Sequence, residues 1–258
     1  MTVTMVYDLE TIPDIETGRR LLGLEKASNK EVAEAMMARR AEQTQGASTF
    51  LPHYLHRIVT ISVVVSTPEW VKVWSLGDPD SSESDIIFRF FEGVQRYTPN
   101  LVSWNGSGFD LPVLHYRSLL HGVVADRYWE TGEEDQGFKW NNYLSRYHQR
   151  HTDLMDVLAA YQSRAYAPLD EVSIMLGFPG KMGMHGSDVF ENYEKGNLQG
   201  IRDYCETDVL NTYLIYLRFQ RIRGRLDKTA FDEEEQRLRS FLSASGKPHF
   251  LAFLEEWK

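Results

Sequence analysis

Segments with the composition of β-strands alternate along this chain with segments that have the apolar spacing of helices, and this order restricts the fold more than any other feature. The strand-type segments are rich in β-branched and aromatic residues, and they cover residues 3–7, 57–66, 69–76, 100–105 and the start of 151–158. The order is strand, helices, hairpin, helix, strand, helix, strand and then mostly helix. It predicts an α/β fold with a mixed central sheet flanked by helices.

Helix-type segments account for most of the remaining sequence. Two of them lie in a polar stretch, residues 14–50, and predict a helical insertion after the first strand. Serines before the apolar positions of 81–97 predict a capped amphipathic helix. Further predicted helices cover residues 111–122, 169–177, 187–196 and 198–224, and two more form a C-terminal tail broken near residues 243–246.

Composition limits the class of protein. The chain has 258 residues, of which 42% are hydrophobic, enough for one large core. Cys205 is the single cysteine, which excludes an internal disulfide and a multi-thiolate zinc site, and we expect its thiol in the core. A net charge of -9 excludes a broad positive surface for nucleic acid but permits a local groove. No stretch reaches the ~18 apolar residues of a membrane helix and no basic leader is present, so we expect a cytoplasmic protein without a membrane partner.

Two carboxylates follow the first strand-type segment. Asp8 and Glu10 are two residues apart, so an extended chain points both to one side. We expect them at the end of this strand. The structural alternative is a solvated strand end with no chemical role.

A third carboxylate, Asp110, stands between a glycine-rich turn and a predicted helix in the segment SWNGSGFDLPVL. Its structural alternative is a helix N-cap, a position that aspartate favours. Gly106 and Gly108 form a lone GxG without the rest of a dinucleotide fingerprint. We interpret both glycines as turn residues that end the preceding strand.

The fourth carboxylate lies in the long helix-type segment 198–224. Tyr204 and Asp208 are four residues apart and therefore share one face of this helix, which is largely apolar. A salt bridge to an arginine is the structural alternative for Asp208. Glu206 lies off this face, and we expect it to be a solvated surface charge.

Four carboxylates gathered in a core would repel one another and take up protons unless a cation compensated them. Oxygen ligands select hard ions such as Mg²⁺ or Mn²⁺. A site with several carboxylates can hold two such ions, about 4 Å apart, which is the arrangement of a phosphoryl-transfer centre. The acidic set therefore predicts a metal-dependent enzyme acting on phosphodiesters.

The segments DLET, WNGSGFD and YCETD resemble, in the same order, the three motifs of the DEDD 3'-5' exonucleases, and the Tyr-x-x-x-Asp spacing resembles that of the tyrosine branch. Over residues 1–224 the chain is similar to predicted exonucleases related to the proofreading domain of family-B DNA polymerases. The resemblance implies a ribonuclease H-like exonuclease domain at 1–225, with a helical extension at 226–258 packed on it.

The resemblance also implies roles for individual residues. Asp8, Glu10 and Asp208 would hold a first metal ion, and Asp8 would bridge to a second ion supported by Asp110. Tyr204 would orient the attacking water, and the reaction would be hydrolysis of the 3'-terminal phosphodiester of single-stranded nucleic acid with two Mg²⁺ or Mn²⁺ ions. Candidate contacts to the terminal nucleotide are the neighbours of these acids, Leu9, Thr11, Asn105 and Phe109.

A second candidate for the third motif occurs in the segment HTDLMDV. His151 precedes Asp156 by five residues, which mimics the third motif of the histidine branch and would make His151 a general base. We prefer Tyr204 and Asp208, because the histidine segment has the pattern of a core strand that runs into a helix.

The substrate is open at this stage. We expect DNA 3' ends, with an exoribonuclease and a non-catalytic nucleic-acid-binding module as alternatives. Phosphate contacts are expected at the basic segments 145–151 and 218–225 or at Lys181 in a glycine-rich loop. The aromatic candidates for base stacking are Trp104, Phe109, Tyr128 and Trp129. We expect no polymerase domain after the third motif.

Overall fold

The computed structural model of this protein describes residues 3–258. Its strands are β1 (Thr4–Pro13), β2 (His56–Ser66), β3 (Val71–Ser75), β4 (Asn100–Ser103) and β5 (His151–Asp153). Its α-helices are α1 (Ile15–Leu22), α2 (Asn29–Gln43), α3 (Glu83–Tyr97), α4 (Asp110–His121), α5 (Asp126–Trp129), α6 (Leu154–Leu158), α7 (Leu169–Met175), α8 (Val189–Glu194), α9 (Leu198–Ile222), α10 (Lys228–Ser245) and α11 (Pro248–Glu256).

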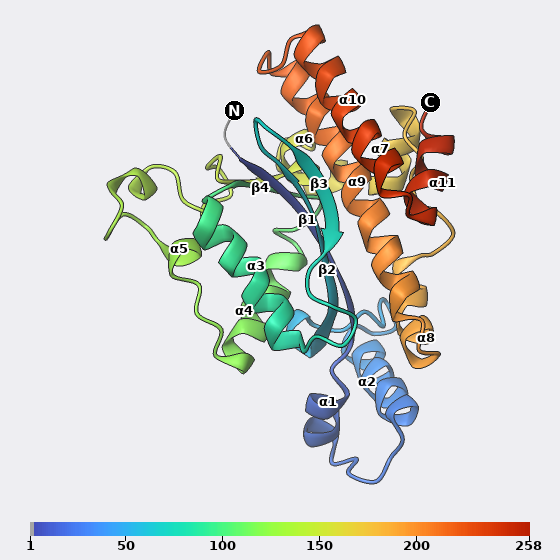
Figure 1. Ribbon diagram of the computed structural model, residues 1–258. Coiled ribbons are helices and arrows are strands. Elements are labelled where there is room, and N and C mark those ends of the chain that lie inside the picture. Colours follow the sequence, from blue (N-terminus) through green and yellow to red (C-terminus); the bar gives the residue numbers. More distant parts are fainter. Residues whose placement is uncertain (1–2) are drawn as a thin grey trace.

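The five strands form one mixed sheet in the order β3-β2-β1-β4-β5 (Figure 1). β2 runs antiparallel to β1 and β3, whereas β4 runs parallel to β1 and β5. The predicted α/β fold with a mixed sheet flanked by helices is therefore confirmed. The carboxyl ends of β1, β4 and β5 point to the same edge of the sheet, where α/β folds commonly place their sites.

Strand β1 is longer than the sequence predicts. It continues through Pro13, so Asp8 and Glu10 lie inside the strand and not at its end. The reason is the partner strand, because β2 pairs with β1 along its whole length, with a shift of register between Glu10 and Thr11. The apolar run alone gave no sign of this pairing.

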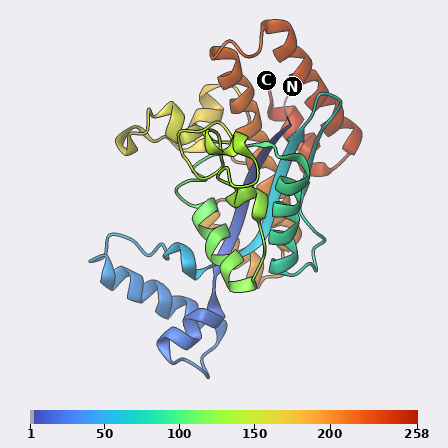
Figure 2. The same cartoon turned by 90° about the vertical axis from the view of Figure 1, so that its left-hand side faces the viewer.

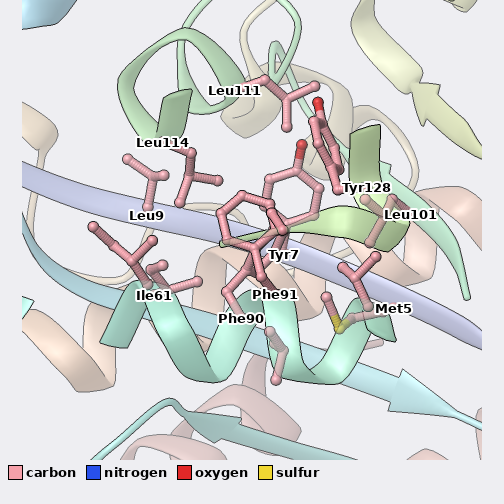
Figure 3. Close-up of a cluster of buried hydrophobic side chains, with 14 of the residues drawn as sticks. Met5, Tyr7, Leu9, Ile61, Phe90, Phe91, Leu101, Leu111, Leu114 and Tyr128 are labelled. Carbon is pink, nitrogen blue, oxygen red and sulfur yellow. The ribbon is translucent and has the colours of Figure 1, made fainter. Parts of the chain in front are cut away.

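Alternate residues of β1 point to opposite faces of the sheet. Met5, Tyr7 and Leu9 pack in a buried apolar cluster with side chains of α3 and α4 (Figure 3). Val6 belongs to a second cluster, formed with α9, α10 and α11 on the other face. Asp8 shares the face of Val6 and therefore points toward α9.

Helices α1 and α2 form the predicted insertion and project away from the sheet in both views (Figures 1 and 2). The base of this hairpin is fixed by the buried guanidinium of Arg117 on α4. Its Nη1 donates to Oδ2 of Asp14 at 2.5 Å, and its Nη2 donates to Oε2 of Glu83 at 2.5 Å. The insertion is therefore tied to the core by charge-assisted hydrogen bonds.

Helices α10 and α11 pack against α9 and share its apolar cluster through Phe231, Phe250 and Phe253. The chain turns between them at Gly246, whose φ of 65° lies in the left-handed region that glycine adopts readily. Both helices and the break between them agree with the predicted C-terminal tail.

The sequence predicts that Glu206 is a solvated surface charge, and this prediction is wrong. This residue is only 2% exposed, and its carboxylate accepts hydrogen bonds from Lys247 Nζ and His249 Nε2, each at 2.8 Å, and from the Ser75 amide at 2.9 Å. The side of α9 that the sequence assigned to solvent is covered by the start of α11, a contact between distant segments that local periodicity does not report.

Candidate functional site

Asp8 and Glu10 meet Cys205 on the face of β1 that α9 covers. The Cys205 Sγ lies 3.5 Å from Oδ2 of Asp8, and ligand atoms of the three side chains lie within 4.8 Å of one another. Burial raises the pKa of the Cys205 thiol, so it stays protonated and acts as a weak donor to Asp8. The expected burial of Cys205 is confirmed, but the sequence did not place it beside the acids.

Helix α9 brings Tyr204 and Asp208 to the same acids. Both side chains are buried, and in addition to burial the charge of Asp208 contributes to the raised pKa of the Tyr204 hydroxyl. Within residues 3–258, Oδ1 of Asp208 has no hydrogen-bond partner and its carboxylate forms no salt bridge with an arginine. The structural alternative that the sequence left open for Asp208 is therefore not realised in this part of the chain.

Asp110 lies on α4, and in addition to burial its charge raises the carboxyl pKa of Asp8 and Glu10. It is the first residue of that helix, and Phe109 takes the N-cap position without a capping side-chain hydrogen bond. Asp110 is 3% exposed, and in the described chain its Oδ1 has no partner. The Asp110 side chain therefore does not cap α4. Because its Oδ1 has no partner among the described residues, this oxygen is available to a ligand.

The electrostatics of these four carboxyl groups indicate mutual repulsion. Burial, followed by the charges of Asp110 and Asp208, raises the pKa of Asp8 well above its usual value. Burial and the charge of Asp8 do the same to the pKa of Glu10. Burial raises the pKa of Asp110 to about 7 and that of Asp208 to about 6. A largely buried acidic set in which two oxygens have no partner within residues 3–258 fits hard divalent cations, which bind oxygen ligands and offset such repulsion.

Lys181 supplies positive charge beside this set. Its Nζ lies 5.5 Å from the centre of the Tyr204 ring, and its charge lowers the carboxyl pKa of Asp208 and Glu10. The loop that carries it is fixed by hydrogen bonds between Gly180 and the Asn211 side chain. The glycine-rich pattern around Lys181 was the sequence signal for this loop.

An open cleft of about 470 Å³ gives access to the acids. Asp8 and Asp208 contribute to its wall, together with Lys181. The remaining lining residues follow β4, lie near the start of α6, or lie just before and at the start of α7, namely Trp104, Asn105, Met155, Tyr166, Ala167, Pro168 and Leu169. Trp104 was a sequence candidate for base stacking, and its place in this wall agrees with contact to a ligand.

The alternative third motif consists of His151 and Asp156, and both residues have other contacts in the structure. The His151 ring is buried and its Nε2 is 2.8 Å from Ser103 Oγ and 3.3 Å from the Tyr7 hydroxyl. Asp156 accepts hydrogen bonds from Arg146 and Tyr166. In the described residues neither member of this pair forms a hydrogen bond with the four carboxylates, and both have structural partners of their own.

The four predicted nucleotide contacts occupy different environments. Leu9 is buried in the apolar cluster beneath the acids, so a ligand could reach only its backbone (Figure 3). Thr11 Oγ1 forms a 2.8 Å hydrogen bond with Nδ1 of His56. Asn105 lines the cleft, whereas Phe109 packs against Phe50, with ring centres 5.5 Å apart. Contact of these residues with a nucleotide stays a prediction.

Two residues that sequence reasoning missed support the site. Asp153 accepts the backbone N–H groups of Asn105 and Ser107, each at 2.9 Å, and so fixes the glycine-rich turn before α4. Thr60 pairs with Glu10 across β1 and β2, and its buried Oγ1 has no partner within residues 3–258. The segment 57–66 also contains hydroxyl residues at positions 62 and 66, so no local signal singled out Thr60.

Comparison with known protein families identifies the family of this chain. Residues 48–257 match the model of a family described as predicted 3'-5' exonucleases related to the exonuclease domain of PolB. The chain belongs to this family. The predicted resemblance to PolB-related exonucleases is confirmed, and the mixed sheet flanked by helices agrees with the ribonuclease H-like fold that it implied. The assignment to the tyrosine branch stays a prediction. The matched residues include Asp110, Tyr204 and Asp208, whereas β1 with Asp8 and Glu10 lies before them.

Two relatives of this PolB-related family member are catalytic subunits A of DNA polymerase epsilon. The protein of Saccharomyces cerevisiae is 24% identical over 147 residues, and that of Schizosaccharomyces pombe is 22% identical over 147 residues. The alignments cover 54% and 55% of this chain but 6% of each relative. Across residues 3–258, no helix combines the length and the apolar character needed to cross a membrane.

Proposed function

We propose that this chain is a divalent-metal-dependent 3'-5' exonuclease that removes nucleotides from single-stranded DNA. One observation supports the proposal most: carboxylates of β1, α4 and α9 interact electrostatically, and Oδ1 of Asp110 and Oδ1 of Asp208 are buried without partners in the described chain. Family membership supports the 3'-5' polarity. The DNA preference draws on the printed name of the two relatives, which are DNA polymerases.

Each acidic residue has a proposed role at this centre. Asp8, Glu10 and Asp208 would hold one ion, while Asp8 and Asp110 would hold a second. Divalent ions bound there would supply the Lewis acidity that generates hydroxide and stabilises the leaving oxygen. The carboxylates themselves fix the positions of the charges around the scissile phosphate, and Lys181 adds a positive group at the rim of the cleft.

Tyr204 is proposed to orient the attacking water. Burial, and then the charges of Asp208 and Glu10, raise the pKa of its hydroxyl far above the usual value. The phenol therefore stays protonated at neutral pH and acts through a hydrogen bond, not as a general base. Removal of the hydroxyl should slow the reaction without removing any ligand of the ions.

The test uses single-stranded DNA and RNA labelled at the 5' or the 3' end, incubated with Mg²⁺ or Mn²⁺. We expect a ladder of 5'-labelled DNA products and release of the 3' label as a mononucleotide. Asp8→Ala should abolish the ladder, and Tyr204→Phe should slow it by about 10²-fold. Glu92→Ala, an exposed acid on α3, serves as the matched control and should cleave normally.

Several outcomes would contradict the proposal. If His151→Ala stops cleavage while Tyr204→Phe does not, the assignment of Tyr204 is wrong. Preferential digestion of RNA would select the exoribonuclease alternative. If nucleic acid binds but neither metal supports cleavage, the non-catalytic binding module is the better description.

A further inference from the structure

Aromatic side chains surround Arg146 beside the acidic cleft. The guanidinium carbon of Arg146 lies 6.0 Å from the ring centre of Tyr147 and 5.1 Å from that of Tyr161. The two rings meet edge to face with their centres 5.0 Å apart. We call Arg146, Tyr147 and Tyr161 the Arg146 platform. Tyr147 is 71% exposed, so its ring is not used to build the core.

The Arg146 platform is linked to the cleft through Asp156 and Tyr166. Arg146 Nη2 donates to Oδ2 of Asp156 at 2.7 Å, and the Tyr166 hydroxyl donates to Oδ1 of the same carboxylate at 2.5 Å. Tyr166 and Asn105 line both the acidic cleft and a second pocket of about 400 Å³ whose wall includes Arg146. The two pockets therefore adjoin, and together they lead from the acids to the platform.

The backbone beneath the platform is held in an uncommon conformation. Ala160 and Tyr161 have φ values of 50° and 60°, in the left-handed region that is unfavourable for residues with a Cβ. The Tyr161 hydroxyl donates to the Arg146 carbonyl at 3.4 Å, which helps to hold its ring beside the guanidinium. The exposed aromatic group is thus positioned by the fold, although it lies outside the apolar clusters.

The chemistry of the platform fits a single-stranded nucleic acid. Exposed aromatic rings stack on unpaired bases whatever their sequence, and a guanidinium pairs with phosphate oxygens. The chain as a whole carries a charge of -9, so it must attract a polyanion through local groups. Arg146 uses only Nη2 for Asp156, and its side chain is 45% exposed, so its other N–H groups are available to a phosphate. The position of the platform, one pocket away from the acids, suits the part of a strand that has not yet reached the reaction centre.

We propose that the Arg146 platform binds the single strand a few nucleotides to the 5' side of the scissile bond, with bases stacked on Tyr147 and a phosphate paired with Arg146. This inference deepens the proposed function and rests on it. It makes the protein an enzyme for strands long enough to span both pockets. A dinucleotide, which occupies only the acidic cleft, gains nothing from the platform.

The experiment compares Tyr147→Ala with the wild type on oligothymidylate of about twenty nucleotides and on a dinucleotide. The variant should raise KM for the long substrate by ~10-fold, because it loses the stacking of one base, and leave kcat unchanged. Its kcat/KM on the dinucleotide should equal that of the wild type. Tyr147→Phe keeps the ring and should restore the low KM.

Tyr97→Ala is the matched control, because the ring of Tyr97 also lies beside an arginine, with the Arg96 guanidinium carbon 5.2 Å from its centre, but Arg96 lines neither pocket, whereas Arg146 lines one of them. It should leave both substrates unaffected. If the wild type degrades DNA and Tyr147→Ala has an unchanged KM, the platform is refuted while the exonuclease stands. If the wild type cleaves nothing, fluorescence anisotropy with Ca²⁺ decides: weaker binding of the long oligonucleotide by Tyr147→Ala supports the platform, and equal binding refutes it.

Discussion

Asp110 and Asp208 reach the acids of β1 from two different helices, α4 and α9, and each keeps its Oδ1 buried without a partner among the described residues. Such groups are costly to bury as anions. The fold therefore maintains an arrangement that is unfavourable for the polypeptide by itself. The proposed cation would offset this cost, and the consequences for stability and for pH dependence can be measured.

Replacement of Asp110 or Asp208 by a neutral residue should stabilise the metal-free protein. The folded-state carboxyl pKa values of Asp110 and Asp208 are raised to about 7 and about 6, so their contribution to stability is present below the unfolded pKa and is lost as the pH rises through these values. At about pH 8 with EDTA, Asp110→Asn should raise the free energy of unfolding by on the order of 3 kcal/mol. Urea unfolding measures this. A loss of stability in Asp110→Asn would mean that the carboxylate has a structural partner.

Metal binding should release protons and tighten with pH. Because the raised pKa values of Asp110 and Asp208 fall near neutrality, each bound ion must displace protons from these groups. Titration calorimetry with Mg²⁺ or Mn²⁺ in buffers of different ionisation enthalpy reports the proton count. We expect the dissociation constant to fall as the pH rises from about 6 to about 8 and then to level off. Affinity that does not change over this range would refute a site built from these two acids.

The buried ring of His151 should destabilise the protein in acid. Burial lowers its pKa to about 4, so the stability it contributes is present above its unfolded pKa of about 6.5 and is lost as the pH falls toward 4. This loss amounts to about 3 kcal/mol. Urea unfolding of His151→Gln at a series of pH values should show a smaller decline between pH 7 and pH 4 than the wild type. An identical decline would assign the acid sensitivity to other groups.

Arg117 should be essential for the attachment of the inserted helices. Arg117→Met leaves the buried carboxylates of Asp14 and Glu83 without their common partner. The loss of one partner from a buried ion pair costs about 3–5 kcal/mol. Urea unfolding measures the change, with Arg20→Met on α1 as a control whose stability should be close to wild type. A variant Arg117→Met of normal stability would show that the ion pairs are dispensable.

Much of the fold could be predicted because it is encoded locally. The amphipathic segment 81–97 and its serine cap predicted α3, where Ser82 and Asp85 form a capping box. The inserted helices and the two helices of the tail were predicted in the same way from composition and apolar spacing. The full length of β1 could not be predicted, because it depends on pairing with β2, whose residues lie more than 40 positions away in the register Pro13 to His56.

The sequence by itself determined the order of strands and helices, the four carboxylates and the family, since these depend on residue identity and spacing along the chain. Only the tertiary structure decided that Asp110 does not cap α4, that His151 is a buried structural partner of Ser103, and that Glu206 is enclosed by α11. Burial and charge interactions depend on distances between segments remote in sequence, and no local pattern records those distances.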